Sequence, residues 1–319
     1  MKKQISIVSP FYNEAESLTS FIEMIGNIKD KLVSSDIEVL EIILVNDGSS
    51  DNSMDILRSI SNPVYPVHVI DLARNFGKEY AMLAGLNAAK GDAVILMDSD
   101  LQHPASYIPS FIEHWQNGYD IVYAYKETRK SEGALRIWGV NLYYKIMNFI
   151  SSSDIQKDAS DFRLIDRKAL DAFLKLPERS RFSKGLFSWV GFRQKAIPYT
   201  PDKRSFGRTK FSSLKLLTFG LTGAVSFSVR PLRMSSILGF VVAFPAFLWA
   251  AKILYSKIFL GEPFRGYPAV LSAVLFMSGI QFILIGILGE YIGQIHREVK
   301  GRPNYIIADE FTIKKEDNS

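Results

Sequence analysis

Two long apolar segments lie close together in the last third of the chain. Residues 236–254 carry a single charge, Lys252, and residues 269–289 carry none. Each segment is about 20 residues long, which is enough for a helix to cross a hydrocarbon core about 30 Å thick. Because only residues 255–268 join the two segments, the sequence predicts a hairpin of two transmembrane helices rather than two buried helices of a soluble core.

Basic residues predict the orientation of this hairpin. The joining stretch holds Lys257 and Arg265, whereas the outer flanks of the hairpin hold a larger basic set: Lys210, Lys215, Arg230, Arg233, Arg297, Lys300 and Arg302. By the positive-inside rule, both termini and the large N-terminal part are expected in the cytoplasm. Residues 211–229 are apolar but interrupted, so they are interpreted as interfacial helices leading into the membrane, with an ordinary packing helix as the alternative.

Residues 1 to about 200 alternate strand-like and helix-like segments. Apolar β-rich runs predict strands, and helical patterns with cap residues predict the helices between them. The expected strands are 4–11, 38–47, 67–72, 93–98, 120–125 and 192–200; the expected helices are 14–32, 49–60 with Ser50 or Asp51 as N-cap, 77–90 and 133–150; and residues 161–173 are expected to form a strand that enters a helix. This alternation favours a mostly parallel α/β sheet with helices on both faces.

The predicted organisation has four parts. They are an α/β domain (1–210), juxtamembrane amphipathic helices (211–234), a membrane hairpin (235–292, with spans near 236–256 and 269–290) and a C-terminal tail (293–319). The chain has no cysteine, which excludes disulfides, zinc thiolates and a cysteine nucleophile. Its formal net charge of +5 fits phosphate-bearing partners or an anionic membrane surface.

Polar side chains gather where the predicted strands end. Asn13 and Glu14 follow the first strand, Asp47 follows the second, residues 74–78 follow the third, and residues 98–103 follow the fourth. Ligands of parallel α/β sheets bind at the carboxyl ends of the strands. The coincidence of these clusters at one edge therefore predicts a binding site there.

Two acids, Asp98 and Asp100, stand one residue apart at the end of a buried strand. Carboxylate oxygens are preferred ligands of Mg²⁺ and Mn²⁺, and Mg²⁺ commonly binds one or two carboxylates together with substrate phosphates. The pair therefore predicts a divalent-cation site, with a solvated turn as the alternative. Asp47 at the neighbouring strand end is interpreted as either a functional acid or a turn residue.

Basic residues follow the same strand ends. Arg74 and Lys78 flank Gly77, which precedes a helix whose N-terminus favours anions. Asp161 and Arg163 alternate along one strand and therefore share a face, either as functional groups or as a structural salt bridge.

A second basic loop, residues 204–212, comes just before the membrane-directed segment. Arg204, Thr209 and Lys210 have the chemistry to bind phosphate oxygens, with lipid headgroups as the alternative partner. Taken together, the acids and the two basic loops predict a diphosphate bound through a divalent metal, near a second phosphate site at the membrane. A soluble nucleotide sugar and a membrane-embedded lipid phosphate fit the two sites.

Seven stretches resemble family-2 glycosyltransferases that act on polyprenyl phosphates, in particular the bacterial and phage bactoprenol glucosyltransferases of O-antigen modification of lipopolysaccharide. Dolichol-phosphate mannose synthase is a relative. The stretches occur in order over nearly the whole chain: SPFYNEAE, VNDGSSD, RNFGKEYAMLAGL, DSDLQHP, DASDFRLIDR, RSFGRTKFS and LGEYIGQIHREVKGRPNYII.

The resemblance implies a GT-A fold with a Rossmann-like sheet. It implies a cytoplasmic catalytic domain at the bacterial inner membrane, Mg²⁺ or Mn²⁺ as cofactor, no nucleic-acid partner, and self-association, for example as a tetramer. The implied reaction is inverting transfer of a hexose, in first place glucose from UDP-glucose, to undecaprenyl phosphate. GDP-mannose, UDP-GlcNAc or an aminoarabinose donor are the alternatives.

The resemblance also implies roles for particular residues. Asp98 and Asp100 are the implied metal site, with Asp100 the more direct ligand, and Asp161 is the implied base or acceptor-positioning group. The other residues implied to bind the donor nucleotide or a phosphate are Pro10, Asn13, Glu14, Asp47, Lys78, Gln102, Arg163, Arg204 and Lys210. Two positions depart from the family pattern, because relatives often have an acid at His103 and glycine at Ser160.

The chemistry of the acceptor favours one role for Asp161. A phosphate monoester has a second pKa of about 6, so it is mostly a dianion at neutral pH and needs little help from a base. We therefore expect Asp161 to position groups, and the metal at Asp98 and Asp100 to stabilise the leaving group.

Other classes of protein fit the sequence less well. A processive polysaccharide synthase would carry a Q-x-x-R-W motif before its membrane helices, whereas the sequence at Gln294 reads QIHRE and follows the hairpin. A non-catalytic scaffold would be expected to lose Asp98, Asp100 or the basic loop, and all are present.

Overall fold

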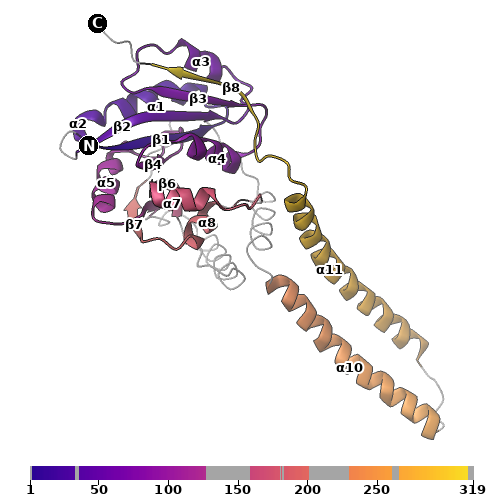
Figure 1. Ribbon diagram of the computed structural model, residues 1–319. Helices are drawn as coiled ribbons and strands as arrows, with labels where there is room; N and C mark the ends of the chain where they lie inside the picture. The colour runs from indigo at the N-terminus through magenta and orange to yellow at the C-terminus, as the bar shows by residue number, and fades with distance from the viewer. Residues whose placement is uncertain are drawn as a thin grey trace. The chain divides into compact units, whose positions relative to one another are not determined.

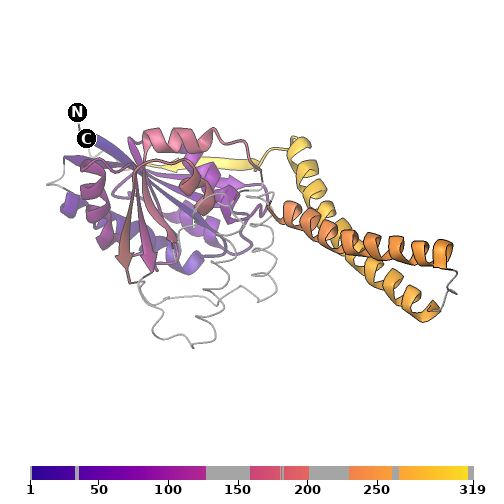
Figure 2. The same ribbon diagram turned by 90° about the horizontal axis from the view of Figure 1, so that it is seen from below.

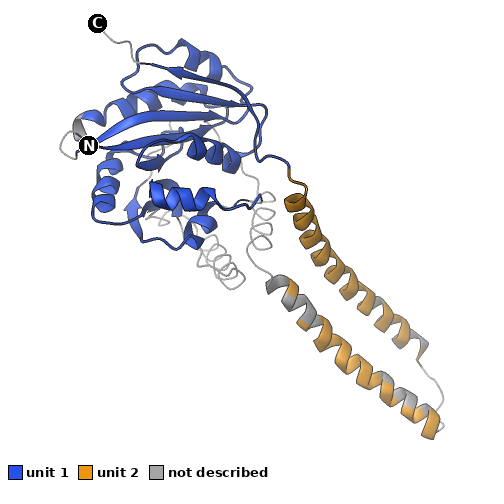
Figure 3. Ribbon diagram, viewed as in Figure 1, with its two compact units in different colours: residues 1–144, 153–211, 302–319 blue, residues 145–152, 212–301 orange. Residues whose placement is uncertain are grey.

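The computed structural model describes residues 2–32, 36–126, 159–179, 181, 183–200, 230–260 and 266–314. The chain divides into two compact units, coloured separately in Figure 3. The first comprises residues 1–144, 153–211 and 302–319, and the second comprises residues 145–152 and 212–301. The expected helices 133–150 and 211–229 lie outside the described residues.

An eight-stranded mixed sheet forms the centre of the first unit (Figure 1). Its order is β7-β5-β6-β4-β1-β2-β3-β8, with β1 (Lys3–Phe11), β2 (Ile37–Asn46), β3 (Val67–Leu72), β4 (Ala93–Leu96), β5 (Ile121–Lys126), β6 (Ala159–Asp166), β7 (Gln194–Tyr199) and β8 (Ile307–Ile313). β1 pairs in parallel with β2 and β4, β2 with β3, and β5 with β7. β6 runs antiparallel to both β4 and β5, and β8 runs antiparallel to β3. The prediction of a mostly parallel α/β sheet is confirmed.

Helices pack on both faces of this sheet. Ile7 of β1 belongs to the same buried cluster as Phe21 of α1. Neighbouring strand residues point to opposite faces, so Val8 lies on the other face of β1. There α4 packs closely, since a Cβ atom on Gly85 of α4 would lie 2.5 Å from Cγ1 of Val8. The helices of this unit are α1 (Ala15–Gly26), α2 (Lys29–Leu32), α3 (Ser53–Ser59), α4 (Lys78–Ala88), the 3₁₀ helix η1 (Ala105–Tyr107), α5 (Ile108–Gln116), α7 (Arg167–Leu174) and α8 (Ser183–Trp189). The single helix expected over 14–32 is thus divided into α1 and α2.

The start of α3 differs from the sequence-based expectation. Its N-cap is Asn52, so the prediction of Ser50 or Asp51 at that position is wrong. The carboxylate of Asp51 instead accepts the backbone N–H of Ser53 at 3.1 Å and that of Ala15 at 3.3 Å. Asp51 therefore joins the start of α3 to the start of α1.

Strand β8 returns to the first unit after the C-terminal hairpin (Figures 1 and 2). The sequence had instead suggested that residues 293–319 form a C-terminal tail. Phe311 and Ile313 pack against the core cluster from alternate positions of the strand. Arg58 pairs with Asp309 at 3.0 Å, although both side chains are about half exposed, so this ion pair contributes little. The stability of β8 therefore comes from main-chain pairing and the two apolar side chains.

Removing residues 303–319 is expected to lower the melting temperature of the first unit by about 5 °C or more, because the edge of β3 loses its partner. The measurement is the thermal unfolding of the full chain and of the truncated chain in the same detergent. Removing only residues 315–319 is the control and should leave the transition unchanged. Equal transitions for all three chains would contradict a structural role for β8.

The second unit contains a hairpin of two long helices. α10 (Arg230–Leu260) and α11 (Tyr267–Val299) lie side by side in Figures 1 and 2. Large apolar side chains on both helices are exposed, for example Phe240 at 68% and Phe282 at 73%. Such a surface is typical of a segment that contacts lipid or another protein. Among the described residues, one helix is long and apolar enough to cross a membrane, at Phe276–Val299, and a shorter apolar stretch lies at Gly239–Trp249.

Candidate active site

A cavity of about 430 Å³ opens at the carboxyl ends of β1, β2 and β4. Seven of the residues singled out in the sequence line it, together with Phe11, Tyr12 and Ser99: Pro10, Glu14, Asp47, Lys78, Asp98, Asp100 and Gln102. The expectation that the polar clusters would meet at one edge of the sheet is therefore confirmed.

Asn13 connects two of the loops that form this edge. Its backbone has a φ of 54°, a region that asparagine tolerates better than most residues. The N–H of Asn13 donates to Oγ of Ser49 at 2.8 Å, and its side-chain Oδ1 accepts the N–H of Ser50 at 2.8 Å. Asn13 thereby holds the loop after β1 against the loop after β2.

Asp47 is buried at the end of β2 and holds the loop that precedes α4. Its Oδ1 accepts the N–H of Phe76 at 2.8 Å, and its Oδ2 accepts the N–H of Gly77 at 3.0 Å. Burial raises the pKa of Asp47 above its ordinary value, although these two backbone donors oppose the shift. Asp47 therefore fixes the position from which Lys78 enters the cavity.

The same loop passes very close to Gly48. Gly48 has a φ of +65°, and a Cβ atom there would lie 2.4 Å from the carbonyl carbon of Arg74 and 2.5 Å from the backbone nitrogen of Asn75. Because both obstacles are backbone atoms, a side chain at this position would have to move the loop that carries Lys78.

Replacing Gly48 with alanine is expected to raise the KM of a substrate that binds in this cavity about tenfold, because the displaced loop misplaces Lys78. Left-handed strain adds a loss of stability of about 1–2 kcal/mol. Gly118→Ala is the matched control, since Gly118 has a φ of +85° but only a side-chain atom, 3.4 Å away, near its Cβ position. It should lower the melting temperature and leave KM unchanged. Equal KM values for the two variants would contradict this account.

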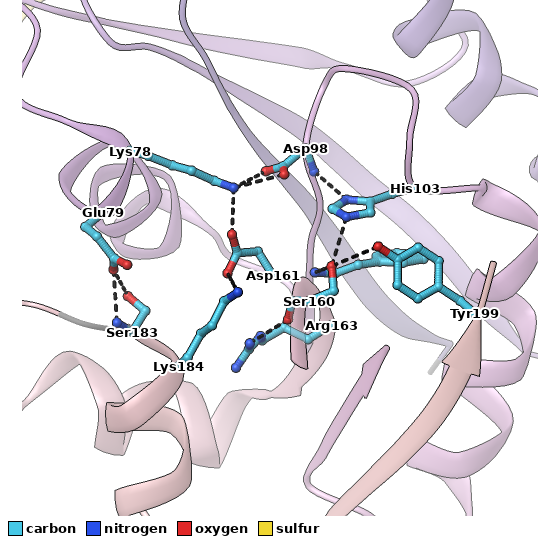
Figure 4. Close-up of polar contacts among 11 residues, drawn as sticks. Lys78, Glu79, Asp98, His103, Ser160, Asp161, Arg163, Ser183, Lys184 and Tyr199 are labelled. Carbon is cyan, nitrogen blue, oxygen red and sulfur yellow. Dashed lines mark hydrogen bonds and ion pairs between the residues drawn. The ribbon is translucent and has the colours of Figure 1, made fainter. Parts of the chain in front are cut away.

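Lys78 bridges two carboxylates that come from different strands (Figure 4). Its Nζ lies 2.8 Å from Oδ1 and 2.9 Å from Oδ2 of Asp98, at the end of β4. The same atom lies 2.6 Å from Oδ2 of Asp161, on β6. Burial lowers the pKa of Lys78, but Asp161 and Asp98 raise it by more, so the pKa lies above its ordinary value. The ammonium is therefore charged throughout the physiological range.

Asp161 is held by further positive charge. Lys184, on α8, lies 3.8 Å from Oδ1 of Asp161, on the side away from Lys78 (Figure 4). Burial raises the pKa of Asp161, but Lys78, Lys184 and the nearby Arg163 lower it by more, so the pKa lies well below the ordinary carboxyl value. Such an ionised acid is a weak base, which agrees with a positioning role. Sequence reasoning missed Lys184, because it stands in no motif.

Arg163 is more deeply buried than expected for a phosphate-binding residue. Its side chain stacks on Phe187 of α8, with 4.4 Å between the guanidinium carbon and the ring centroid. Its Nη2 donates to the carbonyl oxygen of Ser160 at 2.8 Å, while Nε has no hydrogen-bond partner among the described residues. Arg163 does not line the cavity. It shares a face with Asp161, as predicted, and its positive charge helps to lower the pKa of Asp161.

His103 and Ser160, the two departures from the family pattern, contact each other. Nδ1 of His103 accepts the backbone N–H of Asp98 at 3.0 Å, and Nε2 lies 2.9 Å from Oγ of Ser160. Since Nδ1 accepts a hydrogen bond, the neutral ring carries its hydrogen on Nε2, whose N–H donates to Oγ of Ser160. Burial lowers the pKa of His103, which keeps the ring neutral. The pair joins the loop of Asp98 to the strand of Asp161.

Two family models match the sequence. The glycosyl transferase family 2 model matches residues 6–174, and the GtrB C-terminal hairpin model matches residues 230–295. The chain belongs to glycosyl transferase family 2. The first unit is accordingly the GT-A-like catalytic domain of a family-2 glycosyltransferase, and the second contains its hairpin.

Full-length relatives carry both parts. This glycosyltransferase is 42% identical over 306 residues to the SfII prophage-derived bactoprenol glucosyl transferase of Shigella flexneri, covering 95% of this chain and 97% of that protein. It is 41% identical over 306 residues to the prophage bactoprenol glucosyl transferase homolog of Escherichia coli K12, covering 95% and 98%. Glucosyl-3-phosphoglycerate synthase from Mycobacterium tuberculosis, solved with Mn²⁺, UDP-glucose and phosphoglyceric acid, has a TM-score of 0.45 and 17% identity, covering 70% of this chain and 78% of that one.

The glycosyltransferase has residues suited to a divalent cation. Asp98 and Asp100 both line the cavity, and Oδ1 of Asp100 accepts the N–H of Gln102 at 3.1 Å, which orients its carboxylate. The described residues contain no cluster of three or more metal-ligating side chains. A carboxylate pair of this kind fits a cation that takes its remaining ligands from substrate phosphates and water.

Arg204 and Lys210, the expected phosphate ligands of the second basic loop, lie outside the described residues. Their role therefore remains a prediction.

Proposed function

We propose that this family-2 glycosyltransferase transfers glucose from UDP-glucose to undecaprenyl phosphate with inversion at the anomeric carbon. The observation that carries the proposal is the identity of about 42% to a bactoprenol glucosyl transferase over 95% of the chain, hairpin included. The lipid acceptor of that relative is named in its description, and the hairpin of this chain has an exposed apolar surface suited to lipid.

The cavity fits the diphosphate half of such a donor. We assign the nucleotide to the side of the cavity formed by Pro10, Glu14 and Asp47, and the diphosphate to the side formed by Asp98 and Asp100. Mg²⁺ or Mn²⁺ held by these two acids would neutralise the diphosphate and the charge of the leaving nucleotide.

The transfer itself is a single displacement. An oxygen of the lipid phosphate attacks C1 of glucose from the face opposite the nucleotide, the bond from C1 to the β-phosphate oxygen breaks, and the electron pair leaves with UDP. Asp161, which pairs with Lys184 of α8, positions the groups around the acceptor. Its lowered pKa and the dianionic acceptor both argue against proton abstraction as its main task.

The membrane part of the proposal follows from the hairpin. We assign the chain to the bacterial inner membrane, with the catalytic domain and both termini in the cytoplasm, where nucleotide sugars are made. Self-association, for example as a tetramer, remains a prediction.

The donor is tested by incubating the purified full chain in detergent with undecaprenyl phosphate and, separately, with UDP-glucose, GDP-mannose, UDP-GlcNAc and an aminoarabinose donor. Mass spectrometry of the lipid fraction should find a hexose adduct with UDP-glucose, and the ¹H coupling of the anomeric proton should report a β linkage. A lipid product from another donor alone would correct the donor, and no lipid product from any of them would contradict the proposal.

A further inference from the structure

The ammonium group of Lys78 occupies the position that a metal ion bound to Asp98 would take. Its Nζ is within 2.9 Å of both carboxylate oxygens of Asp98, so a cation could bind Asp98 only by disturbing this contact. A divalent cation at Asp98 and the ammonium of Lys78 would therefore meet as like charges at the same two oxygen atoms. The two cannot hold Asp98 in this geometry at the same time.

Lys78 also neutralises the negative charge of two carboxylates that come from different strands, Asp98 and Asp161. Asp98 and Asp161 have side chains that are 25% and 18% exposed, and both are within ion-pair distance of the one ammonium. Two partly desolvated carboxylates so placed repel each other unless a cation lies between them. Lys78 supplies such a cation from within the chain.

Lys78 is placed so that it can leave this position. It is the first residue of α4 and follows Gly77, around whose Cβ position no atom lies within 4 Å. About half of its side chain is exposed, and it lines the cavity assigned to the diphosphate. A rotation of its long side chain would carry the ammonium from the carboxylates to phosphate oxygens without movement of the helix.

We propose that Lys78 is a placeholder cation, which holds Asp98 and Asp161 together in the donor-free enzyme and moves to the diphosphate when the metal and the nucleotide bind. The inference rests on the proposed function in one respect, that the donor is a nucleoside diphosphate sugar. It follows that metal and nucleotide bind cooperatively, because each is needed to release Lys78 from the carboxylates. By linkage, each raises the affinity of the enzyme for the other by the same factor.

The rival account is a permanent ion pair, in which Lys78 orients Asp98 for the metal and stays in place. The two accounts predict opposite changes in metal affinity when Lys78 is removed. A placeholder competes with the metal, so its removal strengthens binding of metal alone, whereas an orienting ion pair supports the metal, so its removal weakens that binding.

The test measures Mn²⁺ binding to the full-length protein in detergent, without any donor, from the EPR signal of free Mn²⁺. Lys78→Met should bind Mn²⁺ about tenfold more tightly than the wild type, within the usual range of coupling between sites. Lys78→Arg, which keeps the charge, should bind as weakly as the wild type. Lys78→Gln is a second neutral variant in case Lys78→Met does not fold.

A second titration, with UDP at saturating Mn²⁺, should report weaker UDP binding to Lys78→Met and a smaller gain in Mn²⁺ affinity on adding UDP. Lys184→Met is the matched control: Lys184 pairs with Asp161 but, among the described residues, has no ion pair with Asp98. Its Mn²⁺ affinity should equal that of the wild type. Unchanged or weaker Mn²⁺ binding to both neutral Lys78 variants would overturn the proposal. Because no acceptor is present, this outcome is independent of whether glucose is transferred to the lipid.

Discussion

Replacing Asp100 with asparagine is expected to lower kcat for glucosyl transfer by about 10²- to 10³-fold. Asparagine has the same size and keeps an oxygen that can accept the N–H of Gln102, so the loop should keep its shape. The lost property is the negative charge that would hold a divalent cation beside the diphosphate. The leaving nucleotide then departs without its main stabilisation. The measurement is steady-state transfer at saturating UDP-glucose and undecaprenyl phosphate, repeated over a range of Mn²⁺ concentrations.

Asp92→Asn is the matched control for this variant. Asp92 precedes β4 at the end opposite to Asp98 and Asp100, and its Oδ2 accepts the N–H of Gln4 at 2.8 Å. Asparagine can keep that contact, so activity should stay within about twofold of the wild type. If Asp100→Asn were as active as Asp92→Asn at every Mn²⁺ concentration, Asp100 could not be the metal ligand.

Replacing Asp161 with asparagine should lower kcat by about 10²-fold, because the amide lacks the charge that pairs with Lys184 and orients groups around the acceptor. The pH–rate profile separates this explanation from a catalytic base. A positioning residue leaves the shape of the profile unchanged, so the variant should be slower by the same factor at each pH. The measurement is kcat between pH 6 and pH 9 at saturating acceptor, for the wild type and the variant.

Recovery of the variant as the pH rises past the pKa of the lipid phosphate would instead assign Asp161 the role of base. The pKa of Asp161 adds a constraint on the wild type. Because Lys78 and Lys184 lower this pKa despite burial, the carboxylate stays ionised well into the acid range. Its ion pairs contribute stability above the ordinary carboxyl pKa and lose it only as the pH falls through the lowered value. They should therefore give neither stability nor activity a dependence on pH near neutrality.

The sequence predicted the edge where the site lies and every strand except β8, because each relevant signal is local. The apolar run of β4 ends directly at Asp98, and the corresponding run of β2 ends at Asp47, so both acids could be placed at the carboxyl ends of parallel strands. The acid pair proposed to bind a metal and Lys78 both line the cavity at this edge, as the placement predicts. The cavity that they line brings together segments that are up to about 90 residues apart in the chain.

Features that depend on contacts distant in sequence were not predictable in this way. Lys184 reaches Asp161 from α8, which carries no motif, and His103 meets Ser160 only when β6 pairs with β4. Strand β8 pairs with β3, which lies far away in sequence on the other side of the apolar hairpin. No local signal in the sequence indicates that the chain returns to the sheet after the hairpin. The N-cap of α3 was placed one or two residues too early, because Asp51 accepts the N–H of Ser53 as a capping side chain would, although the helix begins after Asn52.

Transfer of glucose from UDP-glucose to undecaprenyl phosphate by this enzyme is proposed to require a divalent cation at Asp98 and Asp100. The most direct measurement is the transfer of radiolabelled glucose into the lipid phase by the purified full chain, in Mn²⁺, in excess EDTA, and after Mn²⁺ is restored. We expect transfer in Mn²⁺, its loss in EDTA and its return with the metal, with transfer by Asp100→Asn in Mn²⁺ slower by about 10²- to 10³-fold. Undiminished transfer in EDTA would contradict the metal site, and the absence of labelled lipid under every condition would contradict the reaction.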